Sequence, residues 1–537
     1  MDIVRVGGES TEQQLPEKIG AKAANLARMA ALGLPVPPAF VLPIGLCAAM
    51  IADRARAEQE LRDGLKQGIA FLESTTGKRF GDYRRPLLVS VRSGAARSMP
   101  GMLDTVLNVG CTSAAVQGLV RMTGRPRLAW DCRRRFLESF AETVLGRDPA
   151  PLAAHLAEVV AGEGAANDRE LDSEALERLA GDEQTLLEGD GGWLEDADWQ
   201  LDAAAMAVFR SWMSERAQTY RRLQKLEHLQ GTAVTVQAMV FGNGGPASGA
   251  GVAFSRDPSN GEARPIIDFV LDAQGEDVVS GHRAPDTEQM IARALPNLKD
   301  ELGEVLRRME RDFCDVQDVE FTVEDGKLWI LQTRSAKRTP RAALRIAIAL
   351  VHEGLISKDE ALARIADLDL DSLVEVTLTS PGQPAAAGIG ASGGIAVGRV
   401  AFDSRNAQRL AIAGDPVILM RPDTSTADVA GFAVAGGIVT MIGARTAHAA
   451  LVARQMGKPC IVGCSDLAID PVARQARIGD ASISAGDWVT IDGDSGNLYL
   501  GRLETATTRP EKELAEIEHW RAQSPRSADP LKAPTCA

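Results

Sequence analysis

Apolar residues recur at helical spacing over long stretches of the 537-residue chain. Between residues 15 and 32 they fall every three or four positions, and Gly33 with the prolines behind it ends the pattern. The same periodicity dominates residues 125–230 and returns over residues 339–368. These three regions are predicted to be helical.

Apolar runs of a second kind are short and bounded by turn residues, which is typical of β-strands. Residues 87–91 form such a run in front of a glycine-rich turn. Further runs occupy residues 233–241, 251–255, 265–271, 318–323 and 328–332. The first part of the chain is therefore expected to place strands around a helical insert.

The last third of the chain has a different pattern. Residues 377–394 are rich in Pro, Gly, Ala and Ser, which predicts a hinge or linker. Strand and helix patterns alternate from residue 395 to about 501. The tail over residues 502–537 contains one amphipathic helix, from Glu511 to Trp520, and a polar end that is expected to be disordered.

Composition and charge exclude several classes of protein. With 45% apolar residues the chain can build sizeable cores, and a formal charge of −14 argues against a general nucleic-acid binder. The chain contains no uninterrupted run of 18 apolar residues, so no membrane span is predicted. The N-terminus lacks the apolar core of a signal peptide. The seven cysteines are scattered and odd in number, which favours a reducing cytoplasm. Cys460 and Cys464 lack the further ligands of a zinc site.

One histidine stands out among the six in the chain. His448 is surrounded by small residues and precedes a helix-compatible run, so its imidazole is expected at a helix N-terminus. There the backbone N–H groups and the helix dipole favour an anion, which suits an imidazole that accepts a phosphoryl group. A partly buried histidine that merely starts a helix is the alternative for this residue taken alone.

The surrounding motifs resolve that alternative, because six blocks resemble the pyruvate phosphate dikinase family in the family's order. The SMPGMLDT motif resembles the dikinase more than its water-using relatives. The blocks are KIGAKAANL (18–26), VRSGAARSMPGMLDT (91–105), QAMVFGN (237–243), QGEDVV (274–279), QDVEF to LQTR (317–334) and the His448 region (417–463).

This resemblance implies an α/β protein with several domains. An ATP-grasp nucleotide-binding domain is expected over residues 1–338, with a helical insert at about 112–230. A helical connector and flexible linker (339–394), a swivelling β/β/α phosphohistidine domain (395–503) and the tail (504–537) complete the prediction.

The resemblance also implies roles for individual residues. Most of these functional roles have a structural alternative. Lys22 or Arg92 could be a solvated surface charge, Met239 or Val240 could pack in the core, and Glu320 and Gln332 could be a polar cross-strand pair. Predicted contacts are Lys22 and Arg92 with ATP phosphates, Gly249 and Gly251 in a glycine-rich phosphate loop, Gln237, Met239 and Val240 beside adenine, Glu320 and Gln332 with Mg²⁺ and nucleotide, and Asp318 and Arg334 as their companions.

The chain departs from the family around the nucleophile. The usual Gly-Gly-Met-Thr-Ser-His is here Gly-Ala-Arg-Thr-Ala-His, so Ala447 lacks a hydroxyl and Arg445 adds a cation. We hypothesise that Arg445 attracts phosphate. Arg421 and Thr424 are weaker candidates for supporting the phosphorylated imidazole.

The leading hypothesis for function is phosphotransfer from ATP to His448, with inorganic phosphate as co-substrate and AMP and pyrophosphate as products. Family members continue into a TIM barrel that binds pyruvate and phosphoenolpyruvate, so the expected acceptor is pyruvate on a separate barrel protein. Two alternatives stay open: a different small-molecule acceptor, and a non-catalytic regulatory or phosphocarrier protein that binds nucleotide. Retention of the phosphate, metal and histidine candidates together counts against the second.

Overall fold

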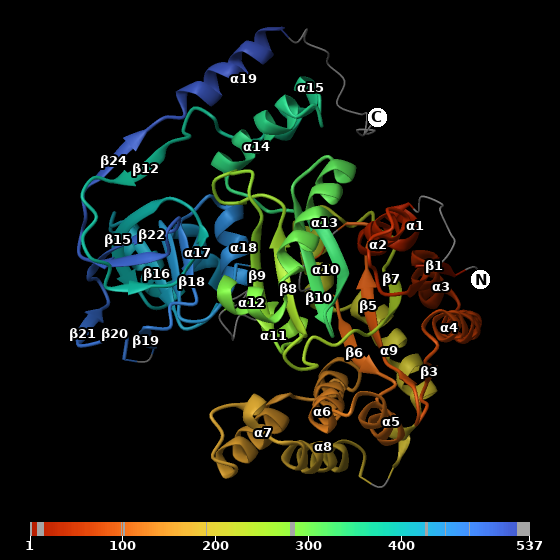
Figure 1. The fold of residues 1–537 in the computed structure, drawn as a ribbon. Helices are drawn as coiled ribbons and strands as arrows, with labels where there is room; N and C mark the ends of the chain where they lie inside the picture. Colours follow the sequence, from red (N-terminus) through yellow and green to blue (C-terminus); the bar gives the residue numbers. More distant parts are fainter. Residues whose placement is uncertain are drawn as a thin grey trace. The chain divides into compact units, whose positions relative to one another are not determined.

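The computed structural model describes residues 3–7, 15–97, 99, 103–189, 191–279, 285–424, 428–445, 447–471 and 473–523, without the side chains of Val429 and His448. Figure 1 shows the helices and strands of the described residues. The chain divides into two compact units. Unit 1 comprises Met1–Gly244 with Trp329–Thr333, and unit 2 comprises Gly245–Leu328 with Arg334–Ala537.

Unit 1 is built on a five-stranded sheet with the order β1-β2-β7-β5-β6. Neighbouring strands are antiparallel, and β2 and β7 are buried along their whole length, in keeping with their mostly apolar residues. The strands are β1 (Val4–Val6), β2 (Ala39–Leu42), β5 (Val89–Gly94), β6 (Thr105–Val109) and β7 (Ala233–Ala238). A short pair, β3 (Arg79–Phe80) and β4 (Pro86–Leu87), lies apart from this sheet.

Helices fill the region where the periodicity predicts them. They bury Phe136, Phe140, Val208 and other apolar residues in one core with the sheet of unit 1. The helices of this unit are α1 (Pro16–Ile19), α2 (Ala21–Ala31), α3 (Ile44–Ala52), α4 (Arg54–Thr76), α5 (Ser113–Thr123), α6 (Pro126–Thr143), α7 (Ala150–Gly162), α8 (Ser173–Glu188), α9 (Ala197–Ser211) and α10 (Glu215–Leu223).

A four-stranded sheet of order β11-β10-β8-β9, which we call the β8 sheet, belongs mainly to unit 2, whereas Trp329–Thr333 of β11 belong to unit 1. β8 is central and antiparallel to both β10 and β9. The strands are β8 (Gly249–Phe254), β9 (Ile266–Leu271), β10 (Gln317–Glu324) and β11 (Lys327–Ser335), with α11 (Gly275–Val279), α12 (Glu288–Ala294) and α13 (Leu298–Phe313) between them. The predicted pairing of β10 with β11 is confirmed.

Residues 386–500 form a layered structure that we call the C-terminal sheet domain. Its eight-stranded sheet has the order β13-β23-β22-β15-β16-β17-β18-β14, with β15 to β18 parallel. These strands are β13 (Ala386–Ala387), β14 (Ile389–Ser392), β15 (Ile395–Ala401), β16 (Val417–Arg421), β17 (Gly437–Thr440), β18 (Cys460–Val462), β22 (Trp488–Asp492) and β23 (Asn497–Leu500).

The two faces of this sheet are covered differently, because side chains alternate along each strand. Ile438 and Val462 pack with Ala449, Ala450 and Ala453 of α18 (His448–Gln455). Their neighbours Val439 and Ile461 pack instead with residues of a small sheet. That sheet is β19 (Leu467–Asp470), β20 (Gln475–Ile478) and β21 (Ala481–Ser484), while α16 (Ser404–Ile412) and α17 (Val429–Val434) accompany α18. The layers are therefore β/β/α.

The segment predicted to be a linker is partly structured. β13 pairs with β23 and β14 pairs with β18, so residues 386–392 belong to the C-terminal sheet domain. This corrects the prediction of a hinge or flexible linker over residues 377–394 for the part that spans residues 386–392. The cause is non-local strand pairing, which supplies hydrogen bonds that the local Gly/Ala-rich composition does not reveal.

The connector is formed by two passes of the chain. Outgoing elements are α14 (Pro340–His352), α15 (Lys358–Arg364) and β12 (Glu375–Leu378), and returning elements are β24 (Thr505–Thr508) and α19 (Glu511–Gln523). β12 pairs with β24, and α19 buries Leu514, Ile517 and Trp520 in the core that contains α14 and α15. The predicted tail helix is confirmed, and the end expected to be disordered lies outside the described residues.

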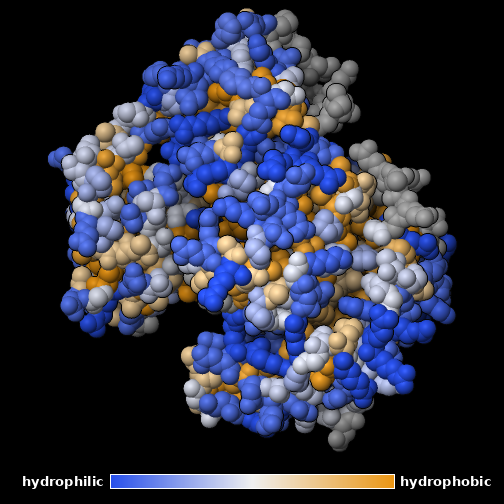
Figure 2. Space-filling view, viewed as in Figure 1, coloured by the Kyte–Doolittle hydropathy of each residue, from blue (hydrophilic) through white to orange (hydrophobic). Residues whose placement is uncertain are grey.

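On the face seen in Figure 2, hydrophilic residues dominate and hydrophobic ones occur in scattered groups. Among the described residues, no helix has both the length and the apolar character needed to cross a membrane. The predicted mixed α/β organisation is confirmed.

Candidate functional site

Four of the predicted site residues line one pocket in unit 1. Lys22, Arg92, Gln237 and Gln332 contribute to it from α2, β5, β7 and β11. The remaining lining residues are Ala23, Leu26, Ser93, Thr235 and Leu331. Residues separated by more than three hundred positions in sequence thus converge on one point, with two cationic side chains and two amides.

Backbone geometry explains how Lys22 and Arg92 come together. Gly20 begins α2 with φ of 83°, and a Cβ there would lie 2.2 Å from the carbonyl oxygen of Gly94. Only glycine permits both that conformation and that approach. The first turn of α2 therefore lies against the end of β5, and the Ala21 N–H donates to the Ala95 carbonyl at 2.9 Å.

The pocket itself is small in this structure. Its volume is about 20 Å³, close to the space that one water molecule needs. Gln237 is 2% exposed and donates to the Pro37 carbonyl at 3.2 Å. A nucleotide needs far more room, so this pocket can take at most one edge or group of a ligand as it stands.

Met239 and Val240 lie just beyond β7 rather than on it. The Met239 N–H donates to the Leu88 carbonyl at 2.9 Å, and its side chain packs on the core of unit 1. Val240 is buried. These contacts favour the packing interpretation of both residues, and their adenine contact stays a prediction.

The predicted glycine-rich phosphate loop is wrong in its conformation. Gly249 and Gly251 lie in β8, which is hydrogen-bonded on both sides, so their backbone groups belong to the β8 sheet. A Cβ at Gly249 would lie 2.2 Å from the Phe269 ring, and one at Gly251 would lie 2.5 Å from the Phe321 ring. The two rings stack with centroids 5.6 Å apart. The glycines therefore make room for aromatic packing.

We expect Gly251→Ala to lower the free energy of unfolding by about 1–3 kcal/mol, because the added methyl group overpacks a rigid aromatic pair. Chemical denaturation measures the change. Gly303→Ala on α13 is the matched control, since its Cβ would contact only the Arg307 guanidinium, at 3.7 Å. The control should be neutral or stabilising. Equal stability of the two variants would contradict the packing role.

Three predicted residues lie together in unit 2. Asp318 on β10 is buried and accepts a hydrogen bond from the Arg334 Nε at 2.7 Å. Burial raises the pKa of the Asp318 carboxyl, while Arg334 opposes that shift. Glu320 lies two residues further along the same strand and is half-buried. Asp318 and Arg334 are therefore an ion pair beside the candidate metal ligand.

The donor types at Glu320 and Gln332 fit a magnesium ion. Mg²⁺ takes one or two carboxylate or amide oxygens and completes its shell with water and substrate phosphate. Within the described ranges, no group of three or more His, Cys, Asp or Glu side chains is arranged to hold a metal. Cys460 and Cys464 are buried, and burial raises the pKa of these thiols to about 12 and about 11.

His448 is the first residue of α18, which confirms its predicted position at a helix N-terminus. Ala447 is the N-cap residue, with φ of −59° and ψ of 157°, and no side chain caps the helix. The family's serine at this position would supply the missing oxygen acceptor. The departure from the family motif thus has a structural consequence.

We expect Ala447→Ser to raise the free energy of unfolding of the chain by about 0.5–2 kcal/mol, because the new hydroxyl can accept from the N–H groups of the first turn. Thermal denaturation checks this. Ala444→Ser is the control, since it alters a nearby alanine that is not an N-cap and is buried. A447S that leaves stability unchanged would show that the helix end is satisfied by other means.

The cations around the nucleophile are already engaged. Arg445 donates from its Nε to the Gly390 carbonyl at 3.2 Å and pairs with Asp268 on β9. Arg421 donates to the Phe402 carbonyl at 2.9 Å and pairs with Asp428 at 3.3 Å. The Thr424 N–H donates to Asp423 at 2.6 Å. The hypothesis that Arg445 attracts phosphate therefore competes with an ion pair.

Two residues near this region were absent from the sequence-based candidates. Asp268 and Arg454 are both buried, at 3% and 0% exposure. Arg454 follows His448 by six positions on α18. In the sequence, Arg454 is marked only as a charge among the alanines of a predicted helix. Asp268 is not marked at all, because its partner Arg445 lies far away in the sequence.

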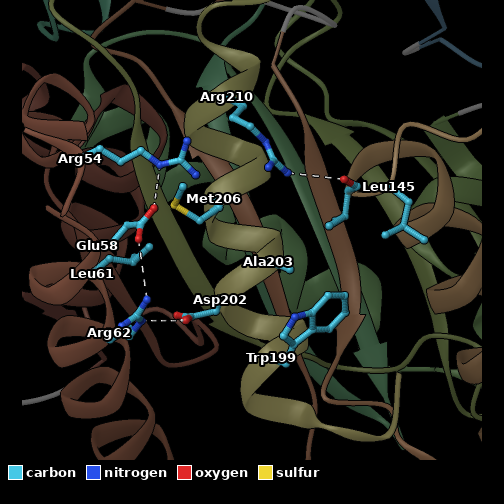
Figure 3. Close-up of a pocket in the computed structure, with 11 residues that line it drawn as sticks. Arg54, Glu58, Leu61, Arg62, Leu145, Trp199, Asp202, Ala203, Met206 and Arg210 are labelled. Atoms are coloured by element: carbon cyan, nitrogen blue, oxygen red, sulfur yellow. Dashed lines mark hydrogen bonds and ion pairs between the residues drawn. The ribbon is translucent and has the colours of Figure 1, made fainter. Parts of the chain in front are cut away.

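A wider pocket of unit 1 has different chemistry. It has a volume of about 420 Å³ and lies between α4 and α9, with Trp199 and Met206 on one wall (Figure 3). Arg54 pairs with Glu58, and Arg62 pairs with Glu58 and Asp202. Acidic side chains therefore pair with two of the three arginines that line this pocket.

Two family models match the chain. The model described as "Pyruvate phosphate dikinase, AMP/ATP-binding domain" matches residues 54–304, and "PEP-utilising enzyme, mobile domain" matches residues 413–496. The fold and the matches define a protein that joins a dikinase-type nucleotide-binding domain to a mobile domain. The predicted fold class is confirmed at this level.

Curated relatives extend the match over nearly the whole chain. It is 39% identical over 510 residues to pyruvate, phosphate dikinase of Clostridium symbiosum, covering 94% of this chain and 58% of that protein. It is 40% identical over 537 residues to pyruvate, phosphate dikinase of Rhizobium meliloti (strain 1021), covering 97% of this chain and 60% of that protein. It is also 40% identical over 508 residues to the chloroplastic pyruvate, phosphate dikinase 1 of Arabidopsis thaliana, covering 94% of this chain and 53% of that protein. These matches place the chain in the pyruvate phosphate dikinase family, and it spans somewhat more than half the length of these relatives.

Proposed function

We propose that the chain transfers a phosphoryl group from ATP to His448, as a pyruvate phosphate dikinase-like phosphotransferase with a phosphohistidine intermediate. The observation that carries the proposal is the convergence of Lys22, Arg92, Gln237 and Gln332 on one pocket of unit 1. Two cations and two amides suit phosphate and polar nucleotide groups. The matched AMP/ATP-binding domain and mobile domain support the same chemistry.

The proposed reaction uses inorganic phosphate as co-substrate. A nitrogen of the His448 imidazole forms a bond to the β-phosphorus of ATP, the bond between the β-phosphorus and the α,β-bridging oxygen breaks, and AMP leaves with that electron pair. An oxygen of phosphate then forms a bond to the γ-phosphorus, the bond between the γ-phosphorus and the β,γ-bridging oxygen breaks, and pyrophosphate leaves while the β-phosphorus stays on His448. This balance explains how AMP, pyrophosphate and phosphohistidine arise together.

Glu320 and Gln332 are the residues that we propose to contact Mg²⁺, which neutralises phosphate charge when it is bound. Lys22 and Arg92 would hold phosphate oxygens and orient the nucleotide for attack. Asp318 and Arg334 would act as companions, because their ion pair fixes the strand that carries Glu320.

We further propose that the phosphoryl group on His448 is transferred to pyruvate. The pyruvate would be held by a separate barrel protein that binds phosphoenolpyruvate and pyruvate. Support for this acceptor comes from the names of the relatives, pyruvate, phosphate dikinases. A cytoplasmic location belongs to the same proposal, although the Arabidopsis relative is named as chloroplastic.

The test is incubation of the purified chain with Mg²⁺ and ATP labelled with ³²P at the β-position, with and without phosphate. Acid-labile, base-stable label that depends on phosphate is the expected result. Adding a purified pyruvate-binding barrel and pyruvate should then discharge the label into phosphoenolpyruvate. Nucleotide binding without label would overturn the proposal and favour a regulatory role.

A further inference from the structure

A buried polar seam lies inside unit 2, between the β8 sheet and the C-terminal sheet domain. Asp268 on β9 and Asp318 on β10 belong to the sheet, while Arg445 and Arg454 belong to the loop and helix around His448. Asp268, Asp318 and Arg454 are almost completely buried. Burying charges is costly unless they are paired, so this cluster must hold a defined arrangement.

The first contact of the seam is an ion pair across the two parts. Arg445 pairs with one carboxylate oxygen of Asp268, while its Nε donates to Gly390 at 3.2 Å. The other oxygen of Asp268 is buried and accepts no hydrogen bond among the described residues. Arg445 therefore provides the polar contact that compensates the burial of Asp268.

The second contact braces the loop from the helix side. The Arg454 guanidinium donates to the backbone carbonyl of Arg445, and its Nε donates to the Ala450 carbonyl at 3.3 Å. Its Cζ lies 5.0 Å from the centroid of the Phe254 ring, at the end of β8. Burial lowers the pKa of Arg454 to about 10, with Asp318 opposing the shift, so the group stays charged at neutral pH.

We propose that Asp268, Arg445 and Arg454 are positioning residues that set the loop before His448 against the β8 sheet for phosphoryl transfer. Arg445 is held at its guanidinium by Asp268 and at its carbonyl by Arg454. Both ends of one residue are thereby fixed, three positions before His448. This inference rests on the proposed function, and it assigns Arg445 to docking rather than to phosphate attraction.

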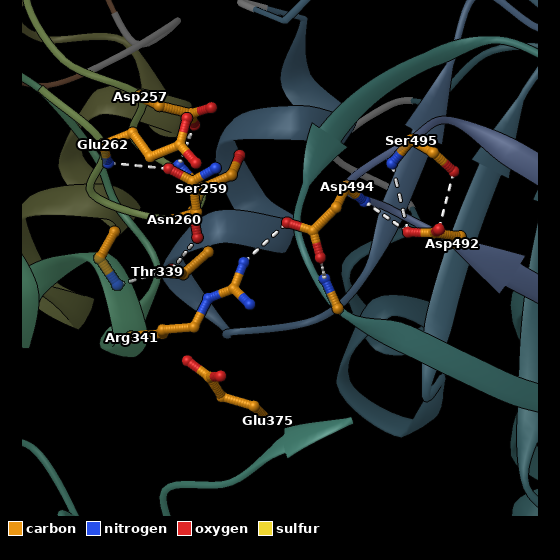
Figure 4. A network of polar contacts seen from close by, with 12 residues as sticks. Asp257, Ser259, Asn260, Glu262, Thr339, Arg341, Glu375, Asp492, Asp494 and Ser495 are labelled. Atoms are coloured by element: carbon orange, nitrogen blue, oxygen red, sulfur yellow. Dashed lines mark hydrogen bonds and ion pairs between the residues drawn. The ribbon is translucent and has the colours of Figure 1, made fainter. Parts of the chain in front are cut away.

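A second ion pair links the connector to the C-terminal sheet domain, away from the loop before His448. Arg341, in the first turn of α14, donates to Asp494 at 2.7 Å, and the other Asp494 oxygen accepts the Gly394 N–H at 2.8 Å (Figure 4). This pair also joins the connector to the C-terminal sheet domain. It provides a matched control, because its removal weakens docking without touching the loop before His448.

The experiment compares D268N, R445M, the double variant and R341M by single-turnover labelling of His448. Misplacement of a reacting group by about 1 Å costs on the order of 100-fold in rate, so we expect D268N and R445M each to slow labelling by about 10- to 100-fold. The double variant should be no slower than the slower single variant, because both act through one contact. The concentration of ATP at half-maximal rate should change by less than about twofold.

The reverse reaction tests whether the same contact acts in both directions of the transfer. Discharge of phosphohistidine by AMP and pyrophosphate should slow by the same factor as labelling, while its hydrolysis in acid should stay unchanged. R341M should change both rates by less than about threefold. Equal slowing by R341M and R445M would overturn the positioning role, as would additive effects in the double variant.

Hydrogen exchange keeps the inference testable without catalysis. In D268N and R445M, the amides of residues 443–456 should exchange faster than in the unaltered chain, and in R341M they should not. If the unaltered chain takes no label, the proposed function fails, and exchange still decides the docking contact. Unchanged exchange in D268N and R445M would overturn the inference.

Discussion

Replacement of His448 by asparagine is expected to abolish phosphorylation of the chain. Asparagine is polar and small enough for the first position of α18, but its amide is not a nucleophile. No other group in the proposed reaction can hold the β-phosphorus after AMP leaves. Label above the background of a heat-denatured sample should therefore disappear, rather than fall by a moderate factor.

Two controls separate chemistry from folding and binding. His228→Asn alters an exposed histidine and should retain full labelling. Affinity of H448N for ATP, measured by calorimetry, should stay within about twofold of the unaltered chain, because the pocket with Lys22 and Arg92 belongs to unit 1. Persistent acid-labile label in H448N would identify a different acceptor residue and refute the assignment.

The sequence predicted those features of the fold that depend on local pattern. Strand runs at residues 265–271 and 318–323 correspond to β9 and β10, and the helix start at His448 is where the small residues predict it. Periodicity and capping signals act over a few residues, so they survive folding. Family motifs also identified Lys22, Arg92, Gln237 and Gln332, which the pocket of unit 1 brings together.

The features that the sequence did not predict depend on contacts between distant segments. The glycines at 249 and 251 predict a phosphate loop, but they make room for rings from β9 and β10. The composition of residues 386–392 predicts a linker, but their strand partners lie 68 to 112 positions away in the register of β14 and β13. Local composition cannot distinguish a flexible glycine from one that a distant side chain requires.

The seam between the β8 sheet and α18 illustrates the same limit for charged residues. Asp268 lies on a predicted strand and Arg454 on a predicted helix, and each alone looks like a solvated charge. Folding buries both, and their positions become meaningful only together with Arg445, which pairs with one and accepts a hydrogen bond from the other. The role that we propose for Arg445 is therefore docking of the loop before His448, in place of phosphate attraction.

Arg92→Met should weaken ATP binding strongly. Arg92 is half-buried on β5, opposite Thr235 of β7 in register, and both line the pocket with Lys22. A guanidinium can bind two phosphate oxygens at once, and truncating such a charged contact costs about 2–5 kcal/mol. We therefore expect the dissociation constant for ATP to rise on the order of 100-fold, measured by calorimetry with Mg²⁺ present.

Arg92→Lys distinguishes geometry from charge. Lysine keeps the positive charge but loses the planar pair of donors, so it should recover only part of the affinity. Arg79→Met provides a control in unit 1, because Arg79 is an exposed arginine on β3 that does not line the pocket. Full affinity in R92M, with R79M also unaffected, would move the phosphate site away from β5. Full affinity in R92K with loss in R92M would instead show that charge alone holds the nucleotide, since the methionine variant lacks the charge as well as the fork of donors.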